Sequence, residues 1–510
     1  MNSSLRITPL ARSLALSLAL AGALCGLGGT AQAAGEAKNV IFFLGDGMGP
    51  VTVTAARIYK GEKQLAATPG SLPTSERAKL TMQSLGHAAR VKTFSNDGQT
   101  TDSAPSMSAY MTGVKANNEV ISMSSDTRAY AADGSQYISG EDTTCAATNG
   151  QPARTLLELA KAQGRAVGAV STTRVGHATP AATYAHVCNR NAYNTIAEQS
   201  VPGHPRYNTL LGDGVDVLLG GGQRNYLPKS TSGSRRTDEL NLVAAMQAKG
   251  YSYVDTGTKL AALDATKAGK LLGLFSQSEM AYELDRVNQK LDQPSLSQMT
   301  QKALDVLSRN DKGFFLMVEG GRIDHALHGT NAKRALEDTL ALDRAIDTAL
   351  AYMEKKDPGL KNTLVVVTAD HDHAIAFNGY TRIGNPILGK VRDYQTNALA
   401  KAADGKPYTT LVFGNGGRPN ATAASQINAE DGNKAWVAPA RGATRDDLTD
   451  VDTTQDNFLQ EVGVNLGTPG SETHGGGDVM LFAGGAGARI FKGTMDNTKV
   501  FSKVREAAGL

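Results

Sequence analysis

The sequence lacks a large excess of either charge. Its 52 Lys and Arg residues are nearly balanced by 49 Asp and Glu residues, which leaves a net charge of +3 over 510 residues. The basic residues are scattered rather than concentrated in one tract, so the charge pattern does not indicate a nucleic-acid partner. With 41% hydrophobic and 20% charged residues, the composition is that of a globular protein and argues against a disordered chain, a collagen or a multi-span membrane protein.

Long apolar runs are also scarce. The N-terminal run Leu14–Leu24 is shorter than the roughly 20 residues that a membrane-spanning helix needs. Arg6 and Arg12 precede this run, and the small-residue segment Ala31–Ala33 follows it. A basic region, a short apolar region and a small-residue cleavage site are typical of a secretory signal peptide. We therefore predict a signal peptide over residues 1–33, export to the periplasm or the medium, and no membrane anchor.

Cysteine is rare, with three residues in the chain. Cys25 lies in the predicted signal peptide, and Leu24 before it argues against lipid attachment, because the residue before a lipidated cysteine is normally small. Cys145 and Cys188 remain, and an even pair in an exported protein predicts a disulfide bond. Two free thiols are the alternative, since the geometry of a bridge depends on the fold.

Short apolar runs that end in glycine or polar residues recur along the chain, with helical patterns between them. This alternation predicts an α/β fold in which a mostly parallel central sheet has helices on both faces. Length alone would suggest several domains, but a large open sheet accommodates residues 34–510 as one domain. The predicted strands are Val40–Leu44, Ala166–Val170, Val215–Leu219, Phe314–Val318 and Leu364–Thr368, and the clearest helices are Ala153–Gln163, Ser297–Leu307 and Ala332–Tyr352.

Residues 378–470 differ from the rest of the chain. They are rich in Gly, Asn, Ala and Thr, they show little periodicity, and Gly414–Asn420 has the composition of turns. We predict a loop-rich subdomain inserted into the α/β domain.

Charged residues stand just past the carboxyl ends of four predicted strands: Asp46, Arg174, Glu319 and Asp370. Ligand sites of open α/β sheets form at that edge, so these groups can converge although they are far apart in the sequence. For any one of them alone, an ordinary solvated loop residue is the simpler explanation.

Carboxylates and imidazoles gather in three short segments. Asp324 and His328 are four residues apart on a predicted helix, which puts both on one face and suits two ligands of a single ion. The segment Thr368–His373 alternates acids and imidazoles, which are costly to bury without a cation, and His474 stands in a glycine-rich loop. These ligand types favour Zn²⁺, with Mg²⁺ where only oxygens converge.

Ser103 begins a predicted short helix, and Asp102 before it is suited to cap that helix. No histidine lies nearby in the sequence, and the Gly-x-Ser-x-Gly pattern of the strained serine elbow is absent around it. A Ser-His-Asp triad therefore has little support. Activation of the hydroxyl by a metal and by the helix N-terminus is the better mechanism, and simple helix capping is the alternative.

Taken together, six stretches resemble the site motifs of the alkaline phosphatase family. They occur in the order found in that family and extend from Asp46 to His474. The segments Val114–Asn118 and Thr183–His186 are similar to the animal-type branch rather than the enteric bacterial branch. The six stretches are Phe42–Gly49, Thr101–Ala104, Thr172–Pro180, Glu319–His328, Thr368–His373 and Glu472–Gly476.

The resemblance implies a role for each matching residue. Ser103 would be the nucleophile that forms a phosphoserine and would contact a zinc ion, while Arg174 would bind two phosphate oxygens. His373 would hydrogen-bond to a zinc ligand, and His177 stands near the third metal, where enteric bacterial enzymes carry an acid. The implied ligand sets are Asp324, His328 and His474 for one Zn²⁺, Asp46, Asp370 and His371 for a second Zn²⁺, and Asp46, Thr179 and Glu319 for one Mg²⁺.

The resemblance also implies hydrolysis of phosphate monoesters with a broad range of alcohols, and a homodimer. One alternative is a phosphodiesterase or sulfatase of the same superfamily, but sulfatases use a modified cysteine and many diesterases a threonine in place of Ser103. A non-catalytic exported metal- or phosphate-binding protein is the other alternative, and the complete set of site residues argues against it. No calcium site of the animal type is predicted, because Ser276 stands where an acid is expected.

Overall fold

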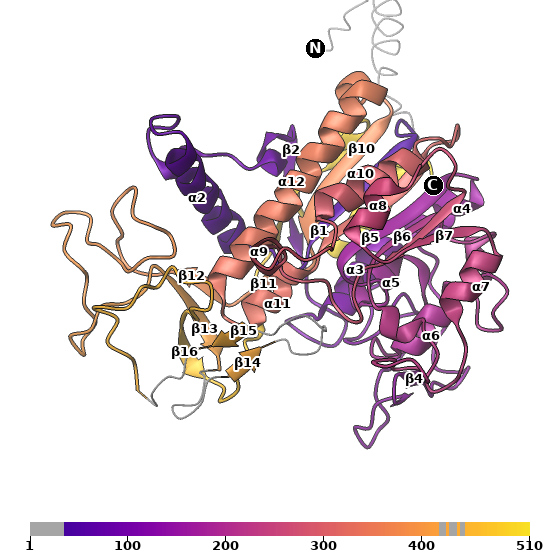
Figure 1. Cartoon of the computed structure of the whole chain (residues 1–510), viewed down its shortest axis with the longest axis horizontal. Helices are drawn as coiled ribbons and strands as arrows, with labels where there is room; N and C mark the ends of the chain where they lie inside the picture. Colours follow the sequence, from indigo (N-terminus) through magenta and orange to yellow (C-terminus); the bar gives the residue numbers. More distant parts are fainter. Residues whose placement is uncertain (1–34, 418–424, 428–435, 439–443) are drawn as a thin grey trace, which may run out of the picture. The chain divides into compact units, whose positions relative to one another are not determined.

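The computed structural model describes residues 35–417, 425–427, 436–438 and 444–510, so the predicted signal peptide lies outside the described residues. A 10-stranded sheet with the order β19-β2-β18-β10-β1-β9-β5-β6-β8-β7 forms the centre of this unit (Figure 1). Strand β18 pairs antiparallel with β10 and β2, and the other neighbouring pairs are parallel. The prediction of a mostly parallel sheet is therefore confirmed.

All five predicted strands belong to this sheet, and their near-continuous apolar runs are buried because helices cover both faces. The strand predicted at Val215–Leu219 begins two residues later than expected, at Val217. The strands are β1 (Asn39–Gly45), β2 (His87–Lys92), β5 (Ala166–Arg174), β6 (Val217–Gly221), β7 (Tyr251–Val254), β8 (Lys270–Leu274), β9 (Phe314–Gly320), β10 (Thr363–Ala369), β18 (Val479–Gly485) and β19 (Gly493–Asp496).

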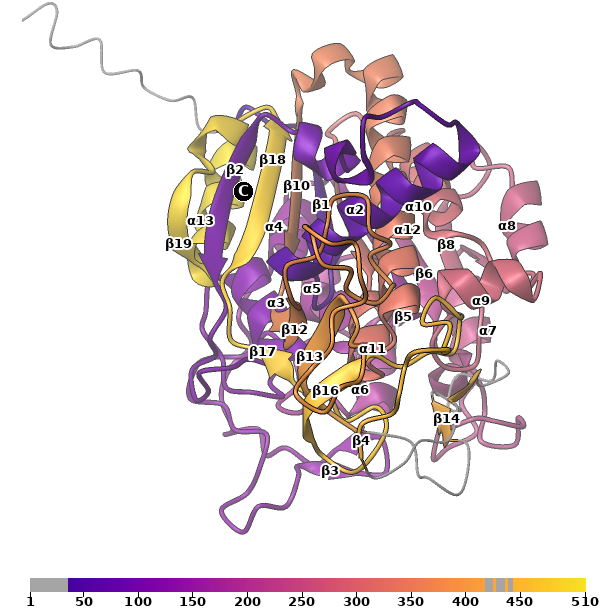
Figure 2. The same cartoon turned by 90° about the vertical axis from the view of Figure 1, so that its left-hand side faces the viewer.

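Helices lie on both faces of the sheet, as predicted. Helices α10 and α12 pack on one face, and α3, α4, α5 and α13 pack on the other (Figure 2). The helices are α2 (Pro50–Ala67), α3 (Ser103–Thr112), α4 (Leu156–Ala162), α5 (Ala178–Tyr184), α6 (Tyr193–Gln199), α7 (Leu242–Ala248), α8 (Gly257–Ala262), α9 (Glu283–Asn288), α10 (Leu296–Leu307), α11 (Arg322–His328), α12 (Ala332–Lys356) and α13 (Asn497–Ala508).

The four central strands β10, β1, β9 and β5 end at the same level. Leu44 of β1 is paired with Thr368 of β10 on one side and with Glu319 of β9 on the other. Ser171 of β5 is paired with Glu319 as well. This register brings the residues that follow β1 and β10 next to the end of β9, and it is the reason that distant segments of the sequence form one site.

The region predicted as loop-rich, residues 378–470, contains only short strands among its described residues. It contributes β13 (Leu411–Gly416) and β16 (Glu461–Asn465) to a small sheet with β12 (Ile375–Phe377), and it carries the pair β14 (Ser425–Ile427) and β15 (Trp436–Ala438). The remaining short strands are β3 (Ile138–Ser139), β4 (Asp142–Thr143), β11 (Asp372–His373) and β17 (His474–Gly475).

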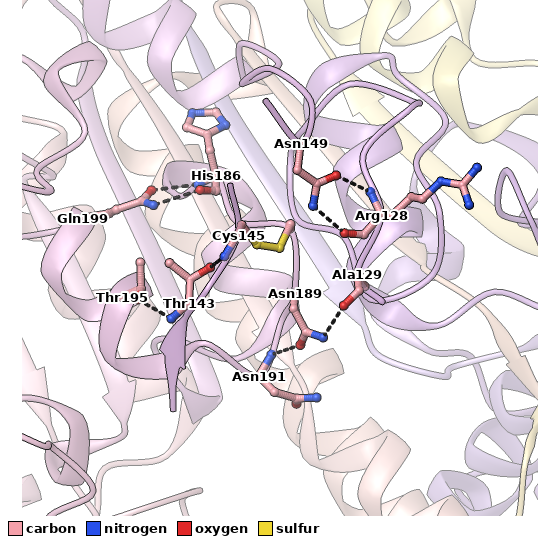
Figure 3. The surroundings of a disulfide bond; sticks show 11 residues. Arg128, Ala129, Thr143, Cys145, Asn149, His186, Asn189, Asn191, Thr195 and Gln199 are labelled. Atoms are coloured by element: carbon pink, nitrogen blue, oxygen red, sulfur yellow. Dashed lines mark hydrogen bonds between the residues drawn. A yellow bond between two sulfur atoms is a disulfide. The ribbon is translucent and has the colours of Figure 1, made fainter. Parts of the chain in front are cut away.

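Cys145 and Cys188 form a disulfide bond, with their Cα atoms 6.4 Å apart (Figure 3). The bridge joins the loop after β4 to the segment between α5 and α6. The sequence prediction of this pair is confirmed. In the described part of the chain, no helix combines the length and the apolar composition needed to cross a bilayer.

Candidate active site

Ser103 is the first residue of α3, and its side chain is buried at the edge of the sheet. Asp102 caps the helix, because its Oδ1 accepts a hydrogen bond from the Ala104 N–H at 2.7 Å. The Ser103 Oγ lies 3.2 Å from the Asp46 Oδ1 and 3.1 Å from the His371 Nε2. The nucleophile candidate thus faces the ends of β1 and β10, and the N-terminal dipole of α3 favours a negative charge on its oxygen.

His371 does not complete a Ser-His-Asp triad, although it contacts the serine. Its Nδ1 lies 3.3 Å from the backbone oxygen of Asp372 rather than from a carboxylate. Its Nε2 faces carboxylate oxygens as well, with Asp46 at 3.2 Å and Asp370 at 3.5 Å. A ring nitrogen surrounded by a hydroxyl and carboxylates is the arrangement of ligands around a shared cation.

Three groups of metal-type ligands adjoin one another at this edge. Asp46 belongs to two of them, which is the position expected of a bridging carboxylate. Within each group, one ligand atom of every member lies within 4.8 Å of the others. The groups are Asp324 with His328, His373 and His474; Asp46 with Asp370 and His371; and Asp46 with His177 and Glu319.

In the first group, Asp324 is the centre. Its Oδ1 lies 2.7 Å from the His373 Nε2, 3.3 Å from the His328 Nε2 and 3.4 Å from the His474 Nε2. Asp324 and His328 share one face of α11, as their spacing predicts, whereas His474 arrives on β17. Gly47 is required here: it has a φ of +65°, and a Cβ on it would lie 2.4 Å from the His373 ring.

Buried oxygens without partners test whether cations fit this site. Among the described residues, Asp46 Oδ2, Asp370 Oδ2, Glu319 Oε1 and Thr179 Oγ1 are buried and have no hydrogen-bond partner. An unpaired buried carboxylate oxygen is expensive, and native structures rarely leave one unexplained. At the third position the oxygens of Asp46, Glu319 and Thr179 outnumber the single imidazole of His177, which suits Mg²⁺, whereas the mixed imidazole and carboxylate groups suit Zn²⁺.

The acids of this edge repel one another when no cation is bound. Burial and the neighbouring carboxylates raise the pKa of Asp46, and they raise the pKa of Glu319 and of Asp370 to about 8. Burial lowers the pKa of His371, and burial together with the charge of His371 lowers that of His474 to about 3. Neutral imidazoles are the form that binds metals, whereas the carboxyl groups need positive charge to ionise.

Arg174 lies at the end of β5, as predicted, but its charge is already paired. Its Nε lies 3.0 Å from the Glu279 Oε1, and its guanidinium stacks on the Tyr193 ring at 4.1 Å. Burial would raise the pKa of Glu279, but Arg174 and the neighbouring imidazoles hold it at about 2. The pair is therefore a buried ion pair.

Sequence reasoning missed Arg190, which lies in the segment between α5 and α6. Its guanidinium reaches the Asp102 Oδ1 at 3.1 Å and the His177 Nε2 at 3.0 Å. Burial alone would lower its pKa, but Asp102 and Glu119 raise it above the ordinary value, and Asp46 contributes to the same effect. A half-buried, permanent cation therefore stands beside the residue that precedes Ser103. The sequence around Arg190 has the composition of a loop and gave no local signal for this role.

Glu472 was quoted in a sequence motif without a role, and it proves to be central to the first group. Its Oε2 lies 2.6 Å from the His373 Nδ1, and its Oε1 accepts a hydrogen bond from the Ala374 N–H at 2.8 Å. Its backbone oxygen contacts the His328 Nδ1. One residue thus orients two imidazoles of the same group, in the manner of the carboxylates that support metal-binding histidines.

A serine beside adjoining cation positions suits displacement reactions on an anionic group, and this places the protein in the class of metal-dependent hydrolases. Comparison with known proteins identifies the family. A model of the family described as alkaline phosphatase matches residues 37–510, and relatives share more than a third of their residues with this chain. The chain belongs to the alkaline phosphatase family.

The relatives include animal enzymes, in agreement with the resemblance in the sequence. The tissue-nonspecific alkaline phosphatase of Mus musculus is 37% identical over 485 residues, which cover 91% of this chain and 82% of the mouse protein. The alkaline phosphatase of Gadus morhua is 37% identical over 495 residues, which cover 91% and 90% of the two chains. The structure of the Thermus thermophilus alkaline phosphatase, 27% identical, superposes with a TM-score of 0.64 and covers 93% of this chain and 92% of its own.

These relationships establish the reaction. The protein is an enzyme that hydrolyses phosphate monoesters, and the family to which it belongs depends on metals. The prediction of a phosphomonoesterase is confirmed, and the sulfatase, diesterase and binding-protein alternatives are not needed.

Proposed function

We propose that the enzyme hydrolyses phosphate monoesters through a phosphoserine on Ser103. The observation that carries this proposal is the position of the Ser103 Oγ, 3.2 Å from Asp46 and 3.1 Å from His371. Both partners are metal-type ligands of one group, so a cation bound there would lie against the hydroxyl. In the first step a Ser103 Oγ–P bond forms and the bond from phosphorus to the alcohol oxygen breaks. In the second step water attacks phosphorus and Ser103 leaves.

We propose two zinc ions and one magnesium ion as the resident metals. Asp324, His328 and His474 would hold one zinc ion, and His373 would keep Asp324 oriented from behind. The second zinc site and the magnesium site would share Asp46, with the remaining ligands being Asp370 and His371 for zinc, and Thr179 and Glu319 for magnesium. When bound, such ions stabilise the negative charge on the attacking and departing oxygens of an in-line displacement.

Several observations support the magnesium assignment. The unpaired oxygens of Glu319 and Thr179 fit an oxygen-preferring cation. A variant of the alkaline phosphatase from the Antarctic bacterium TAB5, 20% identical to this chain, has Mg bound in its M3 site. His177 replaces an acid at this position, and burial keeps its pKa well below the ordinary value, so its ring is neutral and does not repel a cation.

We assign the phosphate contact to Arg190, where the sequence pointed to Arg174. Asp102 caps the helix that begins at Ser103, and the Arg190 guanidinium lies 3.1 Å from the same Asp102 Oδ1 that caps it. A guanidinium at this place can give two parallel hydrogen bonds to the oxygens of a phosphoryl group on Ser103. Arg174 is engaged by Glu279 and Tyr193. On this geometry Arg174 supports the wall of the site.

The experiment that tests the proposal is Ser103→Ala in the purified mature enzyme, with zinc and magnesium present. Loss of the hydroxyl should abolish the phosphoenzyme and lower kcat by about a thousandfold or more, because the nucleophile is removed while the ligands remain. Metal content, measured by mass spectrometry, should stay near that of the unchanged enzyme. Acid-quenched labelling that still detects phosphoserine in the variant would refute the assignment.

Substrate class is tested with a chromogenic phosphate monoester and the matching diester, before and after chelation and readdition of metals. A phosphate monoester presents two negative charges to the cations and to Arg190, whereas a diester presents only one. Activity on the monoester should therefore dominate and return with the metals. Preference for the diester would contradict the proposed phosphate contact.

We further propose a homodimer, export and a broad range of leaving groups. Large apolar side chains are exposed on the loop-rich region and on β12, where an interface would cover them: Phe377, Tyr380, Ile383, Tyr394 and Val464. Export follows from the sequence pattern of residues 1–33 and from the disulfide. Light scattering would show the dimer, and N-terminal sequencing of the exported protein should begin at Ala34.

A further inference from the structure

The disulfide bond lies next to the segment that carries Arg190. Cys188 precedes Arg190 by two residues, in the irregular stretch between α5 and α6. Its partner, Cys145, stands in the loop that follows β4. Figure 3 shows Asn189 and Asn191 of this stretch beside the bridge. The covalent link is therefore made close to the site rather than at a remote edge of the molecule.

Before Cys188 the backbone is held by pairs of hydrogen bonds: Val187 exchanges two with Ile121, and His186 exchanges two with the Gln199 side chain. From Cys188 to Asn191 the hydrogen bonds are single ones. The Arg190 N–H donates to the Glu119 backbone oxygen at 2.8 Å. The Asn189 side chain donates to the backbone oxygen of Ala129 at 3.3 Å and accepts from the Asn191 N–H at 2.9 Å (Figure 3). No helix or strand includes residues 185–192. Between Cys188 and Asn191 the backbone is therefore held by single hydrogen bonds and by the disulfide, and cleavage of the disulfide leaves the single bonds alone to fix it.

The loop that Arg190 contacts is itself tied to the nucleophile. Glu119 has a φ of +70°, which a residue with a side chain adopts only where its surroundings enforce it. The Glu119 N–H donates to the Asp102 Oδ2, and the Asp102 N–H donates to the Asn118 Oδ1 at 3.1 Å. The Arg190 backbone, the Glu119 loop and Asp102 thus form a closed ring of contacts around the start of α3.

We propose that the Cys145–Cys188 disulfide is a positioning element of the reaction. It holds the backbone of Arg190 so that the guanidinium is already oriented toward the phosphoryl group before substrate binds. This inference rests on the proposed role of Arg190 as the phosphate contact. A long, charged side chain loses much of its freedom when it binds, and a backbone fixed in advance lowers that cost. Breaking the bridge should therefore weaken phosphate binding more than it slows the chemical step.

The position of the bridge makes it accessible to a reductant. A cavity of about 260 Å³ is lined by Cys145, Cys188, Met123 and His186, and Cys145 is only half-buried. A phosphine reductant can thus supply the two electrons that cleave the S–S bond. One water molecule completes the balance: its oxygen goes to phosphorus to give the phosphine oxide, and its two protons go to the sulfurs to give two thiols.

A double-mutant cycle tests the proposal. The inhibition constant of inorganic phosphate is measured, with saturating zinc and magnesium, for the unchanged enzyme, Cys145→Ser/Cys188→Ser, Arg190→Ala and the combined variant. Removal of the bridge should raise this constant by about 2- to 10-fold when Arg190 is present, the range expected for one long side chain that is no longer held. The same removal should change it by less than about twofold when Arg190 is alanine, because the two effects share one cause.

Arg174→Ala is the matched control in a second cycle. Arg174 lies on β5, inside the loop that the disulfide closes, but it is not next to the bridge. The factors by which Arg174→Ala and the cysteine substitutions change the inhibition constant should therefore multiply in the combined variant. An equal effect of the cysteine substitutions with and without Arg190 overturns the positioning role. An unchanged constant in Arg190→Ala alone overturns the role of Arg190 instead, so the two failures are distinguishable.

Reduction of the folded enzyme covers the case in which the cysteine variant does not fold. The native, metal-loaded enzyme is treated with the phosphine, and thiol titration confirms cleavage of the bridge. The KM for a monoester should rise by about 2- to 10-fold while kcat changes by less than about twofold, because only the cost of ordering Arg190 has changed. Equal KM values before and after cleavage, with metal content constant, would show that the bridge serves stability alone.

Discussion

Two arginines belong to the candidate site, and their partners distinguish their roles. Arg174 is paired with Glu279, and it stacks on Tyr193. Arg190 is paired with Asp102 at the start of α3. Both guanidinium groups are paired, but Arg174 and Glu279 are both buried, whereas Arg190 and Asp102 are partly exposed and Asp102 is the residue before Ser103. A phosphoryl group on Ser103 can therefore replace water at Arg190, while Arg174 contributes to the wall of the site.

Replacement of each arginine by alanine should therefore have different consequences. In Arg190→Ala, the inhibition constant of inorganic phosphate should rise by about 10-fold or more, the loss expected for charge-assisted hydrogen bonds. In Arg174→Ala, the constant should change little, but the unpaired Glu279 should lower the free energy of unfolding by about 3 kcal/mol or more. Inhibition assays and chemical denaturation check the two effects. The reverse pattern would return the phosphate contact to Arg174.

At the scale of elements, the site depends on the pairing of short β11 and β17. His373 of β11 is paired in register with His474 of β17, and the loop before β17 carries Glu472. Glu472 holds His373 through its side chain and His328 through its backbone oxygen. Helix α11, strand β11 and the loop before β17 are thereby linked through one residue, although these segments are far apart in the sequence.

Glu472→Gln should weaken the first metal site. The amide keeps the shape of the side chain and an acceptor for the Ala374 N–H, but it loses the charge that orients His373. Zinc affinity should fall by about 10- to 100-fold, the range measured for supporting residues of metal-binding histidines. Competition with a chromogenic chelator measures this affinity directly.

Glu461→Gln is the control for the loss of a buried carboxylate elsewhere. Glu461 accepts a hydrogen bond from the Thr409 N–H at 3.0 Å and pairs with Arg445, away from the ligand groups. The Glu461→Gln substitution should lower the free energy of unfolding without changing zinc affinity. Identical zinc affinities in Glu472→Gln and the unchanged enzyme would show that His373 is held by other contacts.

For the whole molecule, metal binding and folding stability both depend on the protonation of the buried site residues. Without cations, Glu319 and Asp370 have a pKa of about 8, well above the value of an unfolded chain, and His373 has a pKa of about 10 because burial is outweighed by Glu472 and Asp324. The folded metal-free protein therefore binds more protons than the unfolded chain between about pH 6.5 and pH 9. Its stability must fall as pH rises through that window.

The expected result is a Tm of the chelated protein that decreases from pH 7 to pH 9. With zinc and magnesium present, the cations replace the protons on the carboxyl groups, so the stabilisation by metals should grow over the same range. Calorimetry of both forms at several pH values measures the two curves. A metal-free Tm that rises toward pH 9 would contradict the raised pKa values of Glu319 and Asp370.

Much of this molecule could be predicted from its sequence, because the relevant signals are local. Apolar runs that end in glycine or polar residues mark β1, β9 and β10, since a strand buried on both faces needs apolar residues along its whole length. The spacing of Asp324 and His328 places them on one helical face. The edge at which Asp46, Glu319 and Asp370 meet follows from the rule that parallel strands end together.

Only the tertiary structure decided which of two arginines pairs with Asp102 before Ser103, and that Glu472 contacts two histidines. It also decided that the bridge from Cys188 to Cys145 adjoins the segment of Arg190. These relationships join loops that have no periodicity of their own. Their positions are set by hydrogen bonds such as that from Arg190 to Glu119 and by the bridge to Cys145. The sequence by itself determined the main strands and helices and the family, and it supplied the candidate nucleophile and the candidate ligands that follow strands. The contacts between irregular segments arise only when the packed sheet brings those segments together.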